Sequence, residues 1–152
     1  MTGPGEIWLL EGKHPGGRGK VWLRHSADGG QSWNEVAPGT FGHYMAMVCK
    51  PGQFWILGGG NGAWRSADGL HWKAEGFGGT GMQAYGIALP GDYQGGRTAL
   101  YIVGTIQKKR AVLKSEDGGR TWARLPFPDS ESSFRHVIFF ADSYKGWVGG
   151  EN

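Results

Sequence analysis

The chain has 152 residues, enough for one domain of ordinary size with its own core, and a formal net charge of +3 at pH 7. Its thirty glycines show no Gly-X-Y period, which excludes collagen, and its eight tryptophans, seven phenylalanines and five tyrosines exclude a disordered chain. The mild positive charge favours anionic partners without indicating nucleic acid, and no apolar run approaches the ~18 residues of a membrane span, so we expect no membrane insertion.

Short apolar segments separated by Gly, Pro or Asp-Gly follow one another along the chain, and none shows a helical period with capping residues. In chain order, the segments expected to form strands are Glu6–Gly12, Val21–His25, Trp33–Ala37, His43–Val48, Gln53–Gly59, Ala63–Arg65, Trp72–Gly76, Gln83–Leu89, Ala99–Gly104, Ala111–Lys114, Trp122–Pro126, His136–Ala141 and Gly146–Gly150. Runs of this length joined by turn residues predict antiparallel hairpins in an all-β fold.

Three near-copies of one short motif divide these segments into units. SADGGQSW begins at Ser26, SADGLHW at Ser66 and SEDGGRTW at Ser115, so the steps between them are 40 and 49 residues. Such a period is typical of propeller blades with four antiparallel strands each. We therefore predict an all-β, propeller-type domain of about three blades. A partial blade is expected at 6–38, full blades at 43–77 and 83–127, and the start of another at 135–150.

The motif itself indicates a structural role. Its aspartate can accept hydrogen bonds from backbone N–H groups in its own turn, its glycine suits left-handed torsions, and its serine can bond the same backbone. The tryptophan is expected to lie under the hairpin as a plug. The second copy is one residue shorter and is expected to form a tighter or slightly distorted turn. A calcium loop would need oxygen ligands at alternate positions, which the motif lacks, so we expect no metal. The residues assigned to this structural role are Ser26, Asp28, Gly30, Trp33, Ser66, Asp68, Trp72, Ser115, Asp117, Gly119 and Trp122.

SADGGQSW and SEDGGRTW resemble the Asp-box, also called the bacterial neuraminidase repeat, and VIFFADSYKGWVGG resembles the inner strands of the photosystem II assembly and stability factor family. Asp-boxes also occur in sialidases, xyloglucanases and sortilin-type receptors. The resemblance covers nearly the whole chain. It implies a propeller with the boxes at the blade edge, away from the functional face, and an extracytoplasmic location in the periplasm, a lumen or outside the cell. It does not select a function, because unrelated activities share this fold.

Thirteen predicted strands make little more than three blades, whereas closed propellers typically have four to eight. Two interpretations remain open. The chain is a piece of a longer propeller, or it associates with another copy, in which case His136–Ala141 could supply the inner strand that the partner's first blade lacks.

The loops opposite the boxes form the candidate binding face. Six of the sixteen Lys and Arg residues fall in two of these loops, Gly12–Lys20 and Thr105–Ala111, and neither loop contains an acid. The predicted ligand-binding residues are Lys13, His14, Arg18, His43, Gln83, Lys108, Lys109, Arg110 and His136. The expected partner is anionic or polar, such as a carboxylated glycan or an acidic protein segment. The alternative is that these loops are ordinary solvated turns.

Motifs of known enzyme classes are missing. The sialidase Arg-Ile-Pro motif, the G-x-S-x-G elbow and the phosphate-binding loop do not occur, and no pair among Asp92, Asp129, Glu131 and Asp142 is singled out as a catalytic dyad. We therefore predict a non-catalytic binding or assembly scaffold without a cofactor. One alternative is a fragment of a sialidase- or xyloglucanase-like glycoside hydrolase whose catalytic residues lie in missing blades. The other is a segment whose only activity is self-assembly.

Two further features bear on location and core. The opening residues MTGPGEIW are not those of a signal peptide. Cys49 is the only cysteine, which excludes an internal disulfide, and its apolar neighbours predict a small core residue.

Overall fold

The computed structural model describes residues 5–12, 21–39, 44–50, 52–58, 62–90, 99–126, 136–140 and 145–150. These residues form thirteen β-strands and no helix, so nothing in the described part of the chain is a helix that could cross a membrane. Every strand pair is antiparallel. The prediction of an all-β chain built from antiparallel hairpins is confirmed.

The strands form four sheets, and in each the strands follow in chain order. The first sheet contains β1 (Ile7–Gly12), β2 (Val21–Ser26) and β3 (Asn34–Gly39). The second contains β4 (Tyr44–Lys50), β5 (Gln53–Gly58), β6 (Gly62–Ser66) and β7 (Lys73–Gly76). The third contains β8 (Met82–Ala88), β9 (Leu100–Ile106), β10 (Lys109–Ser115) and β11 (Ala123–Leu125). The fourth contains β12 (His136–Phe140) and β13 (Gly146–Gly150).

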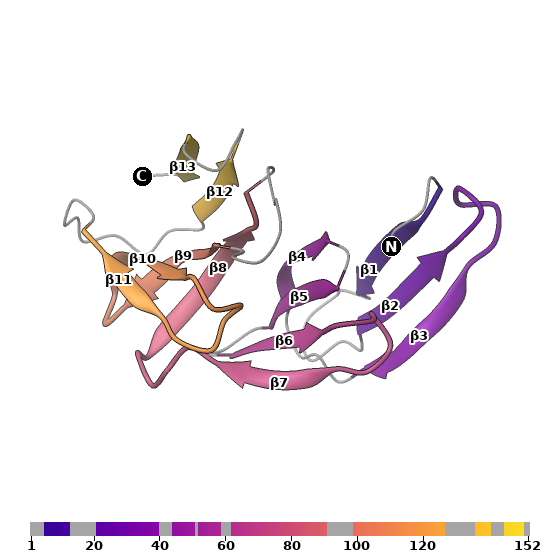
Figure 1. Cartoon of the computed structure of the whole chain (residues 1–152), viewed down its shortest axis with the longest axis horizontal. Coiled ribbons are helices and arrows are strands. Elements are labelled where there is room, and N and C mark those ends of the chain that lie inside the picture. The colour runs from indigo at the N-terminus through magenta and orange to yellow at the C-terminus, as the bar shows by residue number, and fades with distance from the viewer. Residues whose placement is uncertain are drawn as a thin grey trace.

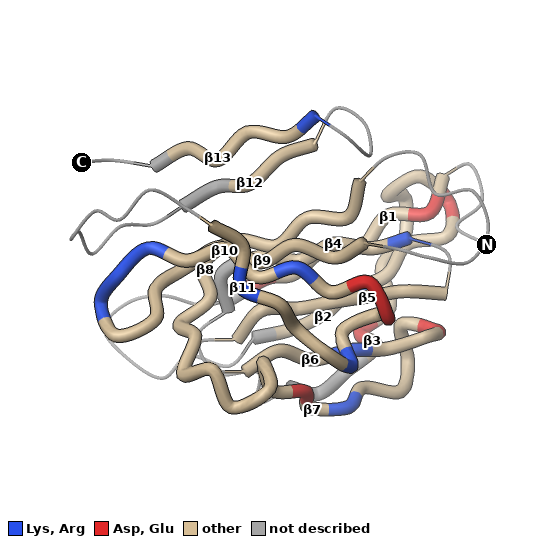
Figure 2. The backbone as a smooth tube through the Cα atoms, turned by 60° about the vertical axis from the view of Figure 1, so that its left-hand side comes forward, with Lys and Arg blue, Asp and Glu red and all other residues tan. Residues whose placement is uncertain are grey.

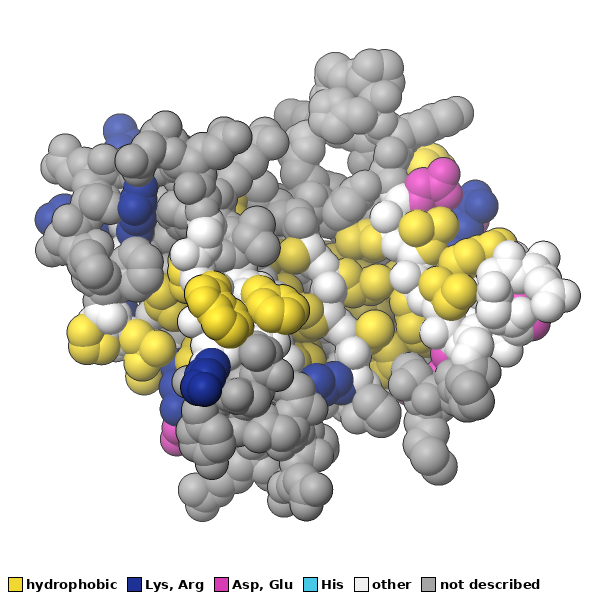
Figure 3. Space-filling model, turned by 90° about the horizontal axis from the view of Figure 1, so that it is seen from above, with side chains coloured by type: hydrophobic (Ala, Val, Ile, Leu, Met, Phe, Trp, Pro, Cys, Tyr) yellow, Lys and Arg dark blue, Asp and Glu magenta, His cyan; other side chains and the backbone are white. Residues whose placement is uncertain are grey.

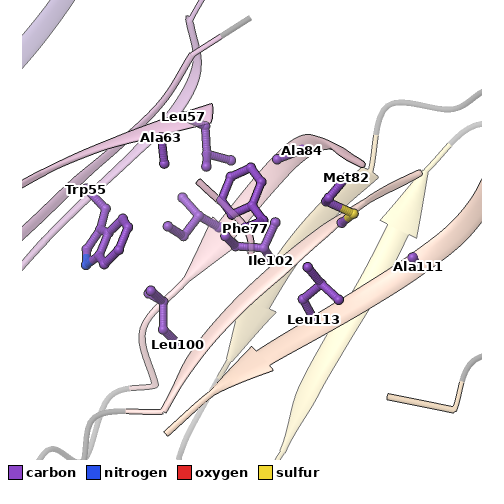
Figure 4. Close-up of a cluster of buried hydrophobic side chains, with 11 residues drawn as sticks. Trp55, Leu57, Ala63, Phe77, Met82, Ala84, Leu100, Ile102, Ala111 and Leu113 are labelled. Carbon is purple, nitrogen blue, oxygen red and sulfur yellow. The ribbon is translucent and has the colours of Figure 1, made fainter. Parts of the chain in front are cut away.

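The sheets succeed one another along an arc, and each packs face to face on the next (Figure 1). The first and second sheets meet around Leu23 and Ile56, both fully buried. The second and third meet in the largest cluster, which includes Leu57 and Ile102 (Figure 4). The third and fourth meet around Val103 and its neighbours. The core is therefore a series of apolar layers between sheets.

This layering explains why the middle strands read as unbroken apolar runs. Successive side chains of a strand point to opposite faces. In β5, Trp55 and Leu57 face the third sheet, while Ile56 faces the first. Because a sheet covers each face, residues 54–58 are all buried, and polar alternation is lost.

The first strands of the second and third sheets carry a β-bulge at equivalent places. In β8 the register shifts between Ala84 and Gly86, opposite Gly104, and in β4 it shifts between Tyr44 and Ala46. A Cβ atom on Gly104 would lie 1.9 Å from the carbonyl oxygen of Gln83, so only glycine permits this close approach.

One core assignment is wrong. Cys49 is exposed, not buried. It is the next-to-last residue of β4 and lies opposite Phe54, which the alternation turns toward the first sheet. Cys49 is exposed because the first sheet covers the centre of β4 more fully than its end.

Candidate functional site

The first and third motif turns share one hydrogen-bond scheme. In the first, the Ser26 hydroxyl donates to Asp28 Oδ1 at 2.7 Å and accepts the N–H of Gly30 at 2.8 Å. Asp28 Oδ1 accepts the N–H groups of Gln31 and Ser32 at 2.9 Å, and its Oδ2 accepts the Ser32 hydroxyl at 2.5 Å. One serine and one aspartate thus accept the three consecutive backbone N–H groups of residues 30–32.

In the third turn, Ser115 and Asp117 make the same bonds, with Gly119, Arg120 and Thr121 as donors.

The second turn keeps this scheme with one residue fewer. Ser66 accepts the N–H of Gly69, three residues on instead of four. Asp68 accepts the N–H groups of Leu70 and His71 at 2.8 Å, and its Oδ2 lies 2.7 Å from His71 Nδ1. The imidazole thus stands where the other two turns use a hydroxyl, and the expected tightening is confirmed.

These bonds stabilise the carboxylate form of all three aspartates. The side-chain hydrogen bond from Ser32 lowers the pKa of Asp28 far below its usual value, and that from Thr121 does the same for Asp117. For Asp68 the main cause of the lowered pKa is the backbone N–H of His71. Carboxylates so fully engaged by their own turn hold the hairpin and are not poised to transfer protons.

The tryptophans that close the turns are not equivalent. The indole N–H of Trp33 donates to the Gly30 carbonyl at 3.1 Å, and that of Trp72 to the Gly69 carbonyl at 2.8 Å. The indole N–H of Trp122 is buried and has no partner among the described residues; its ring packs edge-on against Phe77.

A repeated aromatic–basic pair, which the sequence analysis missed, lies next to each turn. His25, Arg65 and Lys114 each directly precede a motif serine and pair across the strands with Trp8, Trp55 and Tyr101 respectively. The His25 ring stacks on Trp8 with centroids 4.2 Å apart, and the cations of Arg65 and Lys114 lie 5.8 Å from the Trp55 and Tyr101 centroids. A basic residue before every motif serine was the available signal.

A second repeated contact joins neighbouring sheets. The ring of Trp8 lies on Gly69 of the next sheet, and the ring of Trp55 lies on Gly119 of the sheet after that. A Cβ on either glycine would stand within 2.3 Å of the ring. The second sheet therefore offers an aromatic ring, Trp55, on one face and receives a ring on Gly69 at the other.

A polar cleft of about 460 Å³ separates the second and third motif turns. Arg65 crosses it, donating from Nη1 to the Gly118 carbonyl at 2.9 Å, with its Nε 3.7 Å from Glu75. Lys73 and Arg120 also line the cleft. Lys73 also lies 3.7 Å from Glu75, and the bond from Arg65 to Gly118 joins the second sheet to the third turn across the cleft.

The opposite end of the third sheet carries the described part of the candidate binding face. Gln83, Thr105 and Arg110 lie in one register row across β8, β9 and β10. Beyond them, β9 and β10 are joined by a two-residue turn in which Gln107 has φ +50° and Lys108 has φ +65°. Figure 2 shows this basic segment at the edge of the molecule. The structure thus brings Gln83 and the predicted basic residues Lys108–Arg110 to one end of one sheet.

Lys108 and Lys109 are exposed, whereas Arg110 is half-buried and has interaction partners. Left-handed torsions suit Asn-Gly, and a glutamine and a lysine adopt them at a cost of about 1 kcal/mol or more each. The turn therefore has two long polar side chains at its tip, where the backbone torsions would favour asparagine and glycine.

Within its described part, the structure does not bring the other predicted binding residues to this end of the third sheet. Lys13, His14, Arg18 and His43 lie outside the described residues. His136 is described through its backbone alone: it pairs with Gly150, which corresponds to Gly104. Its counterpart in the third sheet, by strand pairing, is therefore Ala84 and not Gln83. The expected match between His136 and Gln83 is off by one position.

The described residues contain no group of three or more His, Cys, Asp and Glu side chains that could hold a metal. The loop acids considered for a glycosidase dyad, Asp92, Asp129, Glu131 and Asp142, lie outside the described residues.

Comparison with protein-family models found no match, and comparisons with curated proteins and with solved structures gave no significant match. The geometry of the repeated turns, the sheet contacts and the basic end therefore carries the functional argument.

Proposed function

We propose that the chain is a non-catalytic binding or assembly scaffold whose sheets are blades of a propeller-like array with Asp-box turns. On this proposal, the box turns and the aromatic–basic pairs hold the sheets together. The partner, an anionic or polar molecule, binds at the opposite end, where Gln83, Lys108 and Lys109 lie.

The regular repetition of the units supports the first part. The three turns bond alike, and the same ring-on-glycine contact joins the first sheet to the second and the second sheet to the third. Repeat architectures have this property, because each unit contacts its neighbours through one recurring interface. The engagement of all three box aspartates within their turns favours a structural over a catalytic use.

The observation that supports this binding site most directly is the strained turn at Gln107 and Lys108 between β9 and β10. Gln107 and Lys108 hold left-handed torsions that glycine or asparagine would adopt more easily. Strain of this kind clusters at binding sites, where the surrounding structure maintains it for the sake of the side chains it displays. Lys108 and Lys109 present adjacent positive charges there, and both are exposed.

Replacement of Lys108 and Lys109 by Ala tests this site. A carboxylated polysaccharide such as polygalacturonate serves as the ligand, neutral dextran as the reference, and titration calorimetry at two salt concentrations as the measurement. We expect the double variant to bind polygalacturonate less tightly and with a weaker dependence on salt, because two charge contacts are lost.

The matched control is Lys73→Ala with Arg120→Ala, which removes two positive charges at the box end. It should retain the affinity of the unmodified chain. Equal losses in both double variants would show that only net charge matters, and would reject the proposed site.

A further inference from the structure

The first and last sheets each turn one face away from the rest of the chain, and both faces expose apolar side chains. On the first sheet, Ile7 and Leu9 are each 41% exposed. On the last, Phe139 is 62% and Trp147 57% exposed, with their rings stacked at a centroid distance of 6.1 Å. Figure 3, which looks down on the arc, shows apolar side chains at the surface near both of its ends.

Strand register shows what the first of these faces is. Ile7 and Leu9 lie one residue to either side of Trp8, as Phe54 and Ile56 do around Trp55. Phe54 and Ile56 are only 5% and 0% exposed, because the preceding sheet covers them. The outer face of the first sheet therefore repeats a face that is covered inside the chain.

The last sheet repeats the other half of the same interface. Trp147 stands three residues before Gly150 in β13, as Trp55 stands three residues before Gly58 in β5, and both strands pair with the strand that precedes them in the chain. Trp147 is therefore the counterpart of Trp55. In the first and second sheets, the ring at this position lies on a glycine of the next sheet. Trp147 instead lies largely exposed.

The matching seat exists on the first sheet. Gly30 is the counterpart of Gly69 and Gly119 in the motif turns, but it is only half-buried whereas they are buried. Among the described residues, the nearest atoms to a Cβ on Gly30 would belong to Ile7 at 3.6 Å and Trp33 at 3.7 Å, both in the same sheet as Gly30. Within the described part of the chain, no ring from another sheet lies on Gly30.

We propose that the face formed by Phe139 and Trp147 binds the face formed by Ile7, Leu9 and Gly30 on a second copy of this chain, with Trp147 seated on Gly30. The contact continues the series of sheet-to-sheet interfaces already present in the chain, where Trp8 and Trp55 make it twice. A second copy is the partner because this same chain already provides both complementary halves. The two surfaces differ, so the association is head-to-tail, and it closes into a ring or extends as a series.

Light scattering on a sizing column across a range of concentrations provides the first test. The unmodified chain should form species of two or more times its 16.5 kDa mass. Trp147→Ala should weaken association about tenfold or more, since buried tryptophans dominate such contacts. Leu70→Ala is the matched control, because Leu70 is 56% exposed on the second motif turn, outside both faces, and this variant should associate normally.

A mixing experiment tests the head-to-tail arrangement itself. Leu9→Glu puts a charge on the first face and leaves Trp147 intact, while Trp147→Ala leaves the first face intact. At a concentration at which the unmodified chain just associates, each variant alone should be monomeric. An equimolar mixture should form a one-to-one complex through the single pair of intact faces, which also shows that both variants fold.

Association that Trp147→Ala reduces and mixing restores supports the proposal. A monomeric unmodified chain overturns it, as expected if further sheets of a longer chain cover these faces. Association that both variants leave unchanged also overturns it and points to pairing through strand edges. Failure of the mixture to form the complex rejects the head-to-tail arrangement.

Discussion

The indole of Trp55 lies so close to Gly119 that a Cβ atom on the glycine would stand 2.2 Å from Cη2 of the ring. The two residues belong to different sheets, so the contact sets how closely the second and third sheets approach.

Gly119→Ala should therefore destabilise the chain by about 2–4 kcal/mol, the sum of overpacking and a left-handed alanine. Gly118→Ala is the control, because Gly118 has φ +72° in the same turn but no atom closer than 4.0 Å to the added Cβ. It should cost only about 1 kcal/mol. Urea unfolding followed by tryptophan fluorescence measures both. Equal losses would mean that backbone strain, and not the ring, makes glycine necessary.

The turn at Gln107 and Lys108 should lower the stability of the fold, because both residues hold left-handed torsions that suit glycine or asparagine better. Gln107→Asn with Lys108→Gly gives the Asn-Gly pair that suits two successive left-handed residues, and should raise the free energy of unfolding by about 1 kcal/mol. The same change should weaken binding to polygalacturonate, because the charge of Lys108 is lost. Chemical denaturation and titration calorimetry measure the two effects. A variant that is no more stable would contradict the strain inferred from the torsions.

Acid should weaken the three motif turns. The folded-state pKa of Asp117 lies below its unfolded value, near 3.9 for a free aspartate, so the carboxylate stabilises the fold above about pH 4. That stabilisation is lost as the pH falls below the unfolded value toward the folded one. Asp117→Asn should therefore be less stable than the unmodified chain at pH 6, and the difference should shrink at pH 3.

Thermal unfolding monitored by circular dichroism from pH 6 to pH 3 measures this. Glu35→Gln removes one carboxylate outside the motif turns and should follow the unmodified chain closely. An Asp117→Asn variant whose deficit stays constant across this range would show that the carboxylate charge is not what stabilises the turn.

The strands and turns were largely predictable because their signals are local. Asp-Gly at the motif centres marks the hairpins, and aromatic runs such as Gln53–Gly59 mark the strands. The shortened second turn was also predictable, since one missing residue must shift the serine's acceptor role from the fourth N–H to the third. These features depend on a few adjacent residues.

The contacts between sheets were not predictable to the same extent. No residue near Trp55 in the sequence predicts its contact with Gly119. The bulge at Tyr85 shifts the register of β8, and the alternation of apolar residues does not predict this shift. In the candidate site, the run of basic residues predicted the basic turn. The left-handed torsions of Gln107 and Lys108 were not predictable, because they depend on the pairing of β9 with β10.

The ring-on-glycine contact also makes the units exchangeable. Since Trp8 seats on Gly69 as Trp55 seats on Gly119, a chain that lost one whole unit would bring Trp8 to Gly119, and a chain that duplicated one would gain a matching joint at each end. Unequal recombination between the repeats would thus change the number of sheets without creating a mismatched seam. The number of sheets can therefore change in evolution, whereas the contact between neighbouring sheets requires a tryptophan on one sheet and a glycine on the next.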